Sequence, residues 1–103
     1  FKDIKLKFLN GEPACRIPVN DEFGKLVEMC AIEEYGKVVK SISSAGTGPM
    51  WYFNKILKCP CVSIGCTYKY SRMHSPNEFA RIDLIKRTTK CIGNILEKFG
   101  KSN

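Results

Sequence analysis

Hydrophobic side chains recur every three to four residues over the last quarter of the chain, with polar side chains between them. At about 100° per residue the apolar positions share roughly half of a helical surface, which is typical of an amphipathic helix. The residues Ser75-Pro76-Asn77-Glu78 match a capping box with proline at the first helical position, and Gly100 suits a C-terminal cap. The pattern therefore predicts a long helix from Ser75 to Gly100, with Cys91 on its buried side.

Two shorter helices are predicted nearer the N-terminus. Asn20 suits the N-cap of the first, and Gly36 is its expected end. Pro49 suits the first turn of the second, which should stop near Pro60. Residues 37–43 fit a short helix as well as a strand.

The first nine residues follow a different pattern, in which apolar and polar side chains alternate. Period-two alternation from Phe1 to Leu9 indicates a half-buried strand or an extended arm. A second alternating stretch, residues 62–70, fits a short strand or an irregular segment held in place by half-cystines. The expected fold is mainly α: a small disulfide-stapled helical domain of three to four helices, with a long C-terminal helix and either a short strand or an extended N-terminal arm.

Six cysteines in 103 residues indicate one secreted domain, residues 1–103, held by three disulfides. Cysteines separated by one residue make strained partners. Cys59, Cys61 and Cys66 are therefore each expected to pair with one of the other three, which are Cys15, Cys30 and Cys91. A zinc site built from Cys59, Cys61, Cys66 and His74 is disfavoured, because two cysteines separated by one residue are poorly spaced to bind one tetrahedral metal ion. No cofactor is expected.

The chain also carries signals of an extracellular location. It begins with Phe1 rather than Met, which fits a product whose signal peptide has been removed. It has no apolar run of the length that a membrane helix needs and no Asn-X-Ser/Thr sequon. We therefore expect a secreted protein without a membrane span.

The net charge of +7 comes entirely from residues 50–103, which hold ten basic and three acidic side chains. Lys86, Arg87 and Lys90 form a basic row on the solvent side of the predicted long helix, and Lys55 and Lys58 can adjoin it. Such a surface attracts an acidic protein surface or heparin-like glycans. A basic face that only maintains solubility is the alternative. No groove-reading motif accompanies the row, so sequence-specific nucleic-acid binding is not expected.

The aromatic run at residues 50–53 is a second candidate site. Four consecutive large side chains cannot all face one core, so Trp51 and Tyr52 are candidates for contact with a partner. The alternative is that Trp51 covers a disulfide and Tyr52 lies flat on the surface.

His74 is the only histidine and the only obvious acid–base group. A serine nucleophile would need this histidine beside Ser71 or Ser75 and an orienting carboxylate. No motif supports that arrangement, so no catalytic residue is assigned. A small secreted hydrolase using His74 is the third of the functions considered.

In size, charge, cysteine number and its Lys-, Ile- and Phe-rich composition, the chain resembles the small basic disulfide-bonded proteins of arthropod saliva. The sand-fly salivary anti-complement proteins are the group it most resembles. The resemblance implies inhibition of an early step of the host complement cascade by binding rather than by catalysis. We expect a non-enzymatic inhibitor of a host defence protein that acts through the basic helical face. A toxin or antimicrobial protein acting on channels or anionic surfaces is the alternative.

Overall fold

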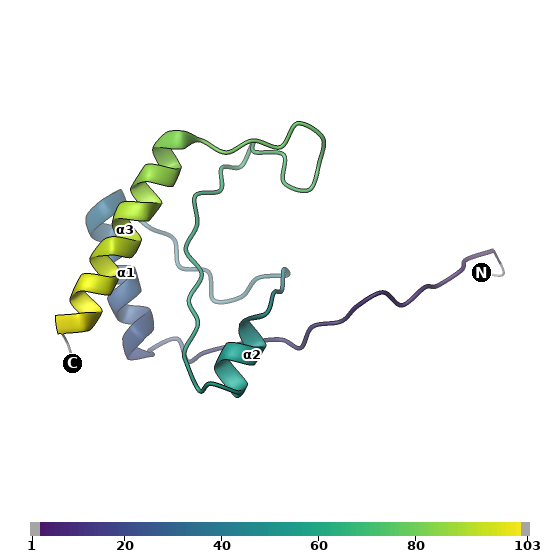
Figure 1. Cartoon of the computed structure of the whole chain (residues 1–103), viewed down its shortest axis with the longest axis horizontal. Helices are drawn as coiled ribbons and strands as arrows, with labels where there is room; N and C mark the ends of the chain where they lie inside the picture. The colour runs from purple at the N-terminus through teal and green to yellow at the C-terminus, as the bar shows by residue number, and fades with distance from the viewer. Residues whose placement is uncertain (1–2, 102–103) are drawn as a thin grey trace.

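The structure is a computed structural model that describes residues 3–101. Along this part of the chain it has three helices, α1 (Glu22–Tyr35), α2 (Met50–Lys55) and α3 (Ile82–Lys101), and no strand (Figure 1). The predicted mainly α class with a long C-terminal helix is confirmed.

The two ends of α1 are set by local side-chain and backbone chemistry. The Asp21 carboxylate accepts a hydrogen bond from the Gly24 N–H at 3.1 Å, which satisfies one of the free donors of the first turn. At the other end Gly36 adopts a φ of 79°, and its N–H donates to the carbonyl of Ile32 at 2.8 Å. The helix thus ends at the glycine that the sequence indicated, while its N-cap is one residue later than predicted.

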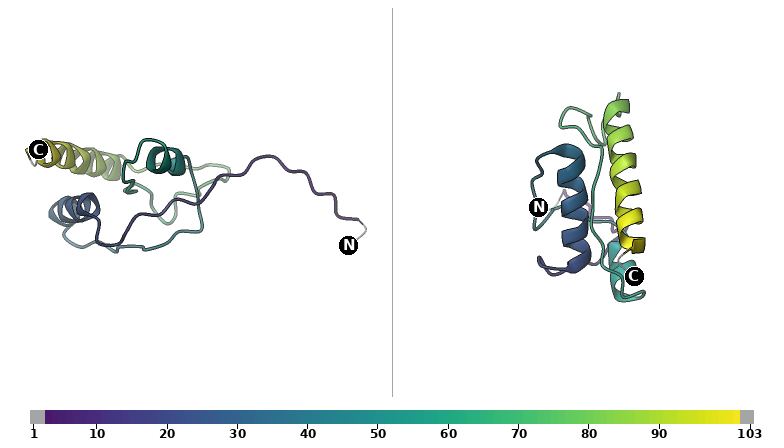
Figure 2. Two further views of the ribbon diagram at one scale, coloured as in Figure 1. Left: turned by 90° about the horizontal axis from the view of Figure 1, so that it is seen from below. Right: turned by 90° about the vertical axis from the view of Figure 1, so that its left-hand side faces the viewer.

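The core lies between α1 and α3, which run antiparallel side by side (Figures 1 and 2). These are the only two helices of the described chain that pack against each other. The buried apolar side chains are Val27, Cys30, Ala31, Cys91 and Ile95. Side chains from the loops, Val38, Val62 and Ile64, pack against this cluster from outside the helices. A core of this size is small for the length of the chain, so the crossing of two helices is its main organising contact.

Polar and aromatic contacts fix the register of the two helices. The hydroxyl groups of Tyr35 and Thr88 lie 2.8 Å apart at one end of the pair. At the other end the rings of Phe23 and Phe99 meet edge to face with centroids 5.8 Å apart. These contacts join the start of each helix to the end of the other.

The N-terminal end of α3 differs from the prediction. Ser75 does not cap a helix: its N–H and its hydroxyl both donate to the carbonyl of Arg72, at 3.0 and 2.9 Å. Arg72, His74 and Asn77 have positive φ values of 57°, 59° and 60°, which an α-helix does not allow. The chain therefore forms a loop over residues 71–79, and the helix begins seven residues after the predicted start.

The C-terminal prediction for α3 is also wrong in detail. Gly100 lies inside the helix, which continues to Lys101. Gly36 is the only glycine of the described chain with a positive φ. The helix therefore does not use Gly100 as a left-handed cap.

The segment leading to α1 forms an extended arm and not a strand (Figure 2). Its apolar side chains face solvent, with Leu6 95% and Phe8 87% exposed. Phe1 and Lys2, the first residues of the predicted alternation, lie outside the described residues. Residues 62–70 are also irregular, so in both stretches the structure shows the non-strand alternative that the sequence allowed.

The helix α2 is shorter than predicted and lies apart from the helix pair (Figure 1). Pro49 occupies its N-cap and not its first helical position, and the helix ends at Lys55, before Pro60. None of its side chains is buried. This helix therefore presents most of its surface to solvent.

Candidate functional site

The basic row of α3 is largely engaged by α1. The Arg87 Nε lies 3.3 Å from the Glu34 Oε1, and the Lys90 Nζ lies 3.1 Å from the Glu34 Oε2. The Arg87 guanidinium also donates to the backbone carbonyl of Glu34 and lies 4.9 Å from the centroid of the Tyr35 ring. Two of the three predicted binding cations thus hold the helix pair together, and Lys86 remains exposed with no ion pair among the described residues.

Contacts with cations of α3 lower the pKa values of two acidic side chains on α1. Hydrogen bonds from Lys90 and then from Arg87 lower the pKa of Glu34. Hydrogen bonds from Lys98 and then from Asn94 lower the pKa of Glu33. These contacts favour the charged form of both carboxylates, which neutralise part of the α3 surface.

An ion pair expected within α3 is replaced by another. The spacing of Asp83 and Arg87 suits an i,i+4 pair. Instead, the Arg81 Nη2 lies 2.5 Å from the Asp83 Oδ2, and this contact lowers the pKa of Asp83. Asp83 therefore pairs with Arg81, and Arg87 pairs with Glu34 of α1 instead.

The segment around α2 exposes a continuous group of large apolar side chains. Tyr52 is 45%, Phe53 49%, Ile56 64% and Leu57 61% exposed. Trp51 is half-buried, and its ring meets that of Tyr52 edge to face with centroids 5.3 Å apart. Lys55 and Lys58 are exposed within the same segment and form no ion pair with the described residues. We call residues 51–53 and 55–58 the α2 surface.

The two candidate surfaces are separated in space. The basic row lies on the first half of α3, whereas α2 lies level with its C-terminal end (Figures 1 and 2). No packing contact joins α2 to α3. Lys55 and Lys58 therefore do not extend the basic row of α3.

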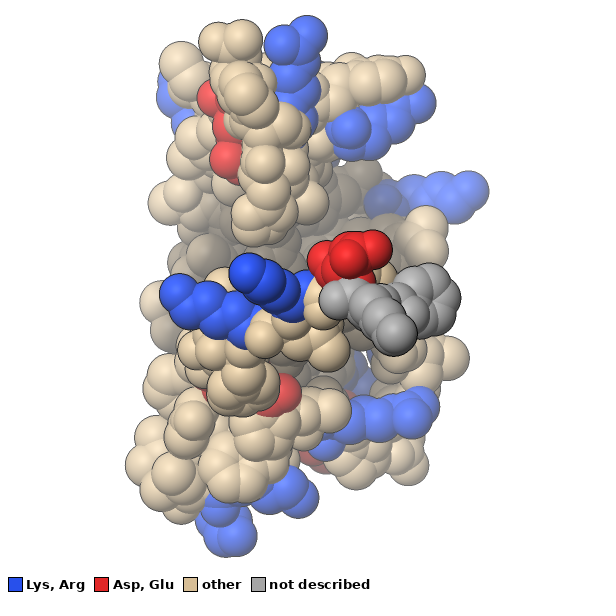
Figure 3. All heavy atoms as spheres, turned by 90° about the vertical axis from the view of Figure 1, so that its right-hand side faces the viewer, with Lys and Arg blue, Asp and Glu red and all other residues tan. Residues whose placement is uncertain are grey.

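The lysines and arginines on the face that Figure 3 shows are spread from end to end, with acidic and uncharged side chains among them. The even scatter on this face is the arrangement expected of a solvated basic surface.

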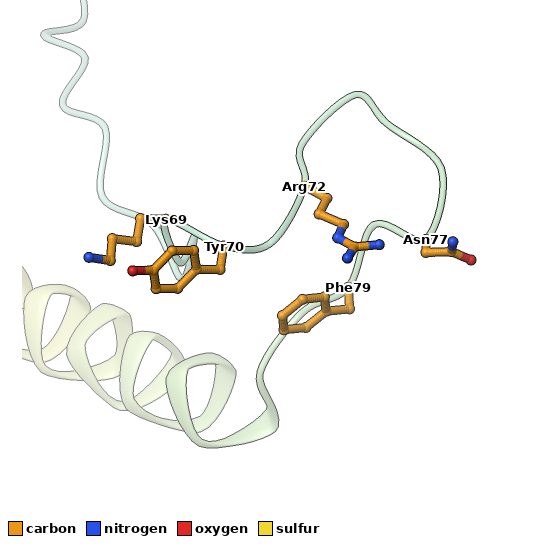
Figure 4. A pocket seen from close by; sticks show the side chains of 5 residues that line it. All are labelled: Lys69, Tyr70, Arg72, Asn77 and Phe79. Carbon is orange, nitrogen blue, oxygen red and sulfur yellow. The ribbon is translucent and has the colours of Figure 1, made fainter.

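A hollow of about 520 Å³ lies where the loop 71–79 begins (Figure 4). Its walls are Lys69, Tyr70, Arg72, Asn77 and Phe79. The Lys69 Nζ lies 4.5 Å from the centroid of the Tyr70 ring, and the Arg72 side chain points toward Phe79. This hollow could not be predicted from the sequence, because it depends on the loop that replaces the first turns of the predicted helix.

His74 lies exposed on the same loop. The Ser71 hydroxyl accepts from the Tyr68 N–H at 3.2 Å, and the Ser75 hydroxyl donates to the Arg72 carbonyl. Neither hydroxyl is hydrogen-bonded to the imidazole in the described structure. The two serines are thus used in the turns of the loop.

The six cysteines are present as free thiols, in unequal environments. Cys30 and Cys91 have no exposed surface, and burial raises the pKa of each. Cys61 is half-buried, and its pKa is raised by burial and by the nearby thiols of Cys15 and Cys59. Cys59 is exposed and Cys66 half-buried.

Residues 3–101 hold neither a metal-binding cluster nor a membrane-spanning helix. They contain no group of three or more His, Cys, Asp or Glu side chains placed to hold a metal ion. No helix within them has the length and apolar character needed to cross a membrane.

The chain matches no protein-family model, no curated protein and no solved structure. Its function must therefore be argued from its own surfaces.

Proposed function

We propose that this protein is a secreted binding protein that inhibits a host defence protein, and that the α2 surface is its contact site. The observation that carries the proposal is the exposure of Tyr52, Phe53, Ile56 and Leu57 beside two lysines without ion pairs. Exposed aromatic and aliphatic side chains gathered in one place mark interaction sites more often than single exposed residues do.

The partner chemistry follows from the charges of this surface. Lys55 and Lys58 favour acidic groups around an apolar contact, and charge complementarity acts mainly on the rate of encounter. The resemblance to anti-complement proteins of sand-fly saliva supports a complement component as that partner. The α3 row is a weaker candidate because Glu34 already engages Arg87 and Lys90.

The test compares three variants with the parent protein in serum-dependent lysis of antibody-coated erythrocytes and in binding kinetics. Tyr52→Ala/Ile56→Ala should weaken binding about tenfold or more through faster dissociation, because aromatic anchors carry much of an interface's energy. Lys55→Glu/Lys58→Glu should slow association, most strongly at low salt. Lys86→Glu reverses one charge on α3 and should leave inhibition intact.

Each outcome decides between specific alternatives. Loss of inhibition in Lys86→Glu alone would move the site to the α3 row. A parent protein that leaves lysis unchanged would remove complement as the target. Release of dye from vesicles rich in anionic lipid by the parent would instead favour the toxin or antimicrobial function.

A further inference from the structure

We propose that the oxidised protein contains the disulfides Cys30–Cys91 and Cys15–Cys61, with Cys59–Cys66 as the third bridge. This connectivity differs from the one that the sequence favoured, in which Cys30 and Cys91 each bond a member of the 59–66 cluster. It is independent of the proposed function and rests on where the folded chain places each thiol.

The first bridge follows from the packing of the two long helices. Cys30 on α1 and Cys91 on α3 belong to the same five-residue core, and neither has any exposed surface. The Cys30 thiol is near enough to contribute to the raised pKa of Cys91. A bridge from either of these cysteines to the exposed Cys59 would require opening the helix pair.

The second bridge follows from the crossing of two extended segments. Cys15, on the chain leading to α1, and Cys61, on the chain leaving α2, line the same hollow of about 850 Å³. Cys59 also lies near Cys61, whose Sγ donates to the Cys59 carbonyl at 3.8 Å. A Cys59–Cys61 bridge would span a single intervening residue, a strained arrangement. Cys15 is therefore the partner of Cys61.

The third bridge follows by elimination, because Cys59 and Cys66 are the two thiols that remain. Both lie on the irregular segment after α2, outside the helix pair. A bridge between them closes a short loop without moving either long helix.

Each bridge forms by two thiol–disulfide exchanges with an external disulfide such as oxidised glutathione or an oxidoreductase. The protein's two thiols release two protons and two electrons as their S–S bond forms, and the external disulfide is reduced to two thiols. The Cys15–Cys61 bond would have a structural consequence, since it would tie α2 to the chain that enters α1. The exposed α2 helix would then hold its position without packing against another helix.

The test is peptide mapping of the protein made in an oxidising compartment and digested with trypsin without reductant. Cleavage after lysine and arginine places Cys30 in residues 26–37, Cys91 in residues 91–98, Cys15 in residues 8–16 and the remaining three cysteines in residues 59–69. The expected products are 26–37 linked to 91–98, and 8–16 linked to 59–69. A link between 91–98 and 59–69, or alkylation of Cys30 and Cys91 without reductant, would overturn the assignment.

Two variants show which of the three cysteines in residues 59–69 is bonded to Cys15. Cys59→Ser/Cys66→Ser should retain the link between residues 8–16 and 59–69, because Cys61 alone then remains in the second peptide. Cys15→Ala should gain one alkylation, at Cys61, while the link between 26–37 and 91–98 persists. Loss of the link in the double variant, or labelling of Cys59 or Cys66 in the single one, would reject Cys15–Cys61.

Discussion

Glu34 pairs with two cations of α3, more than any other residue of α1 does. Its carboxylate faces Arg87 and Lys90 and is only 12% exposed at the side chain. Two cations on one carboxylate favour its charged form, which is why its pKa falls. A residue of α1 thereby pairs with two of the cations that the sequence alone assigned to a partner, although both remain exposed.

The pH dependence of stability should report this contact. A carboxyl group whose pKa is lower in the folded state stabilises the fold at pH above its unfolded value, about 4.3 for glutamate, and ceases to do so as pH falls through the folded value. We expect the unfolding midpoint of the parent to fall on acidification from about pH 5. Glu34→Gln should have a lower midpoint at pH 7 and a shallower decline, as measured by circular dichroism.

A control variant distinguishes the loss of the Glu34 contact from the loss of one negative charge. Asp3→Asn removes a carboxylate from the exposed arm, so its midpoint at pH 7 should match that of the parent. Equal pH profiles for Glu34→Gln and the parent would show that Glu34 does not couple the helices in solution.

At the scale of the element, replacing two glycines of α1 and α3 by alanine should change the free energy of unfolding in opposite directions. Gly36 ends α1 with a φ of 79°, whereas Gly93 lies inside α3, where an added Cβ would meet nothing within 4 Å. Gly36→Ala should lower the free energy of unfolding by about 1–2 kcal/mol, because alanine is strained at positive φ. Gly93→Ala should raise it by about 0.4–1 kcal/mol, because alanine restricts the unfolded chain and favours a helix. Denaturant unfolding measures both, and equal effects would contradict these helix assignments.

The helices could be predicted where local signals agree with the packing. Asp21 and Gly36 bound α1 close to the predicted positions, since capping is decided by neighbouring residues. The start of α3 could not be predicted, because the Ser75 motif is equally compatible with a turn. There Ser75 bonds Arg72, and the Phe79 N–H donates to the Ser71 carbonyl at 3.1 Å.

The candidate site was less predictable than the fold, for a physical reason. Helical periodicity correctly places Arg87 and Lys90 away from the apolar core, but it says nothing about the carboxylates of another helix. The contact with Glu34 joins residues 53 or more positions apart and becomes visible only once α1 and α3 are paired. The aromatic run was recognisable because four adjacent large side chains exceed what one buried helical face can hold.

At the scale of the whole molecule, the chain is extended rather than compact. Its Cα radius of gyration is 17.0 Å, against about 13 Å for a compact domain of this length. The longest dimension is 59 Å, and the N-terminal arm accounts for much of it (Figure 1). Leu6 and Phe8 on this arm have almost no contact with the rest of the molecule, given their exposure. The arm therefore contributes to the shape of the molecule and hardly at all to its core.

This separation predicts the order in which a protease cuts the folded protein. Trypsin needs an extended segment to cleave, and the arm offers Lys5 and Lys7 in that form, whereas Lys86 and Lys90 lie within α3. Under native conditions we expect cleavage at the arm first, leaving a fragment that begins at residue 6 or 8 and keeps the unfolding midpoint of the intact protein. Intact-mass measurements over a digestion time course, followed by thermal unfolding of the purified fragment, test both parts. Arm sites that resist trypsin as long as those of α3, or a fragment with a lower midpoint, would show that the arm packs against the domain in solution.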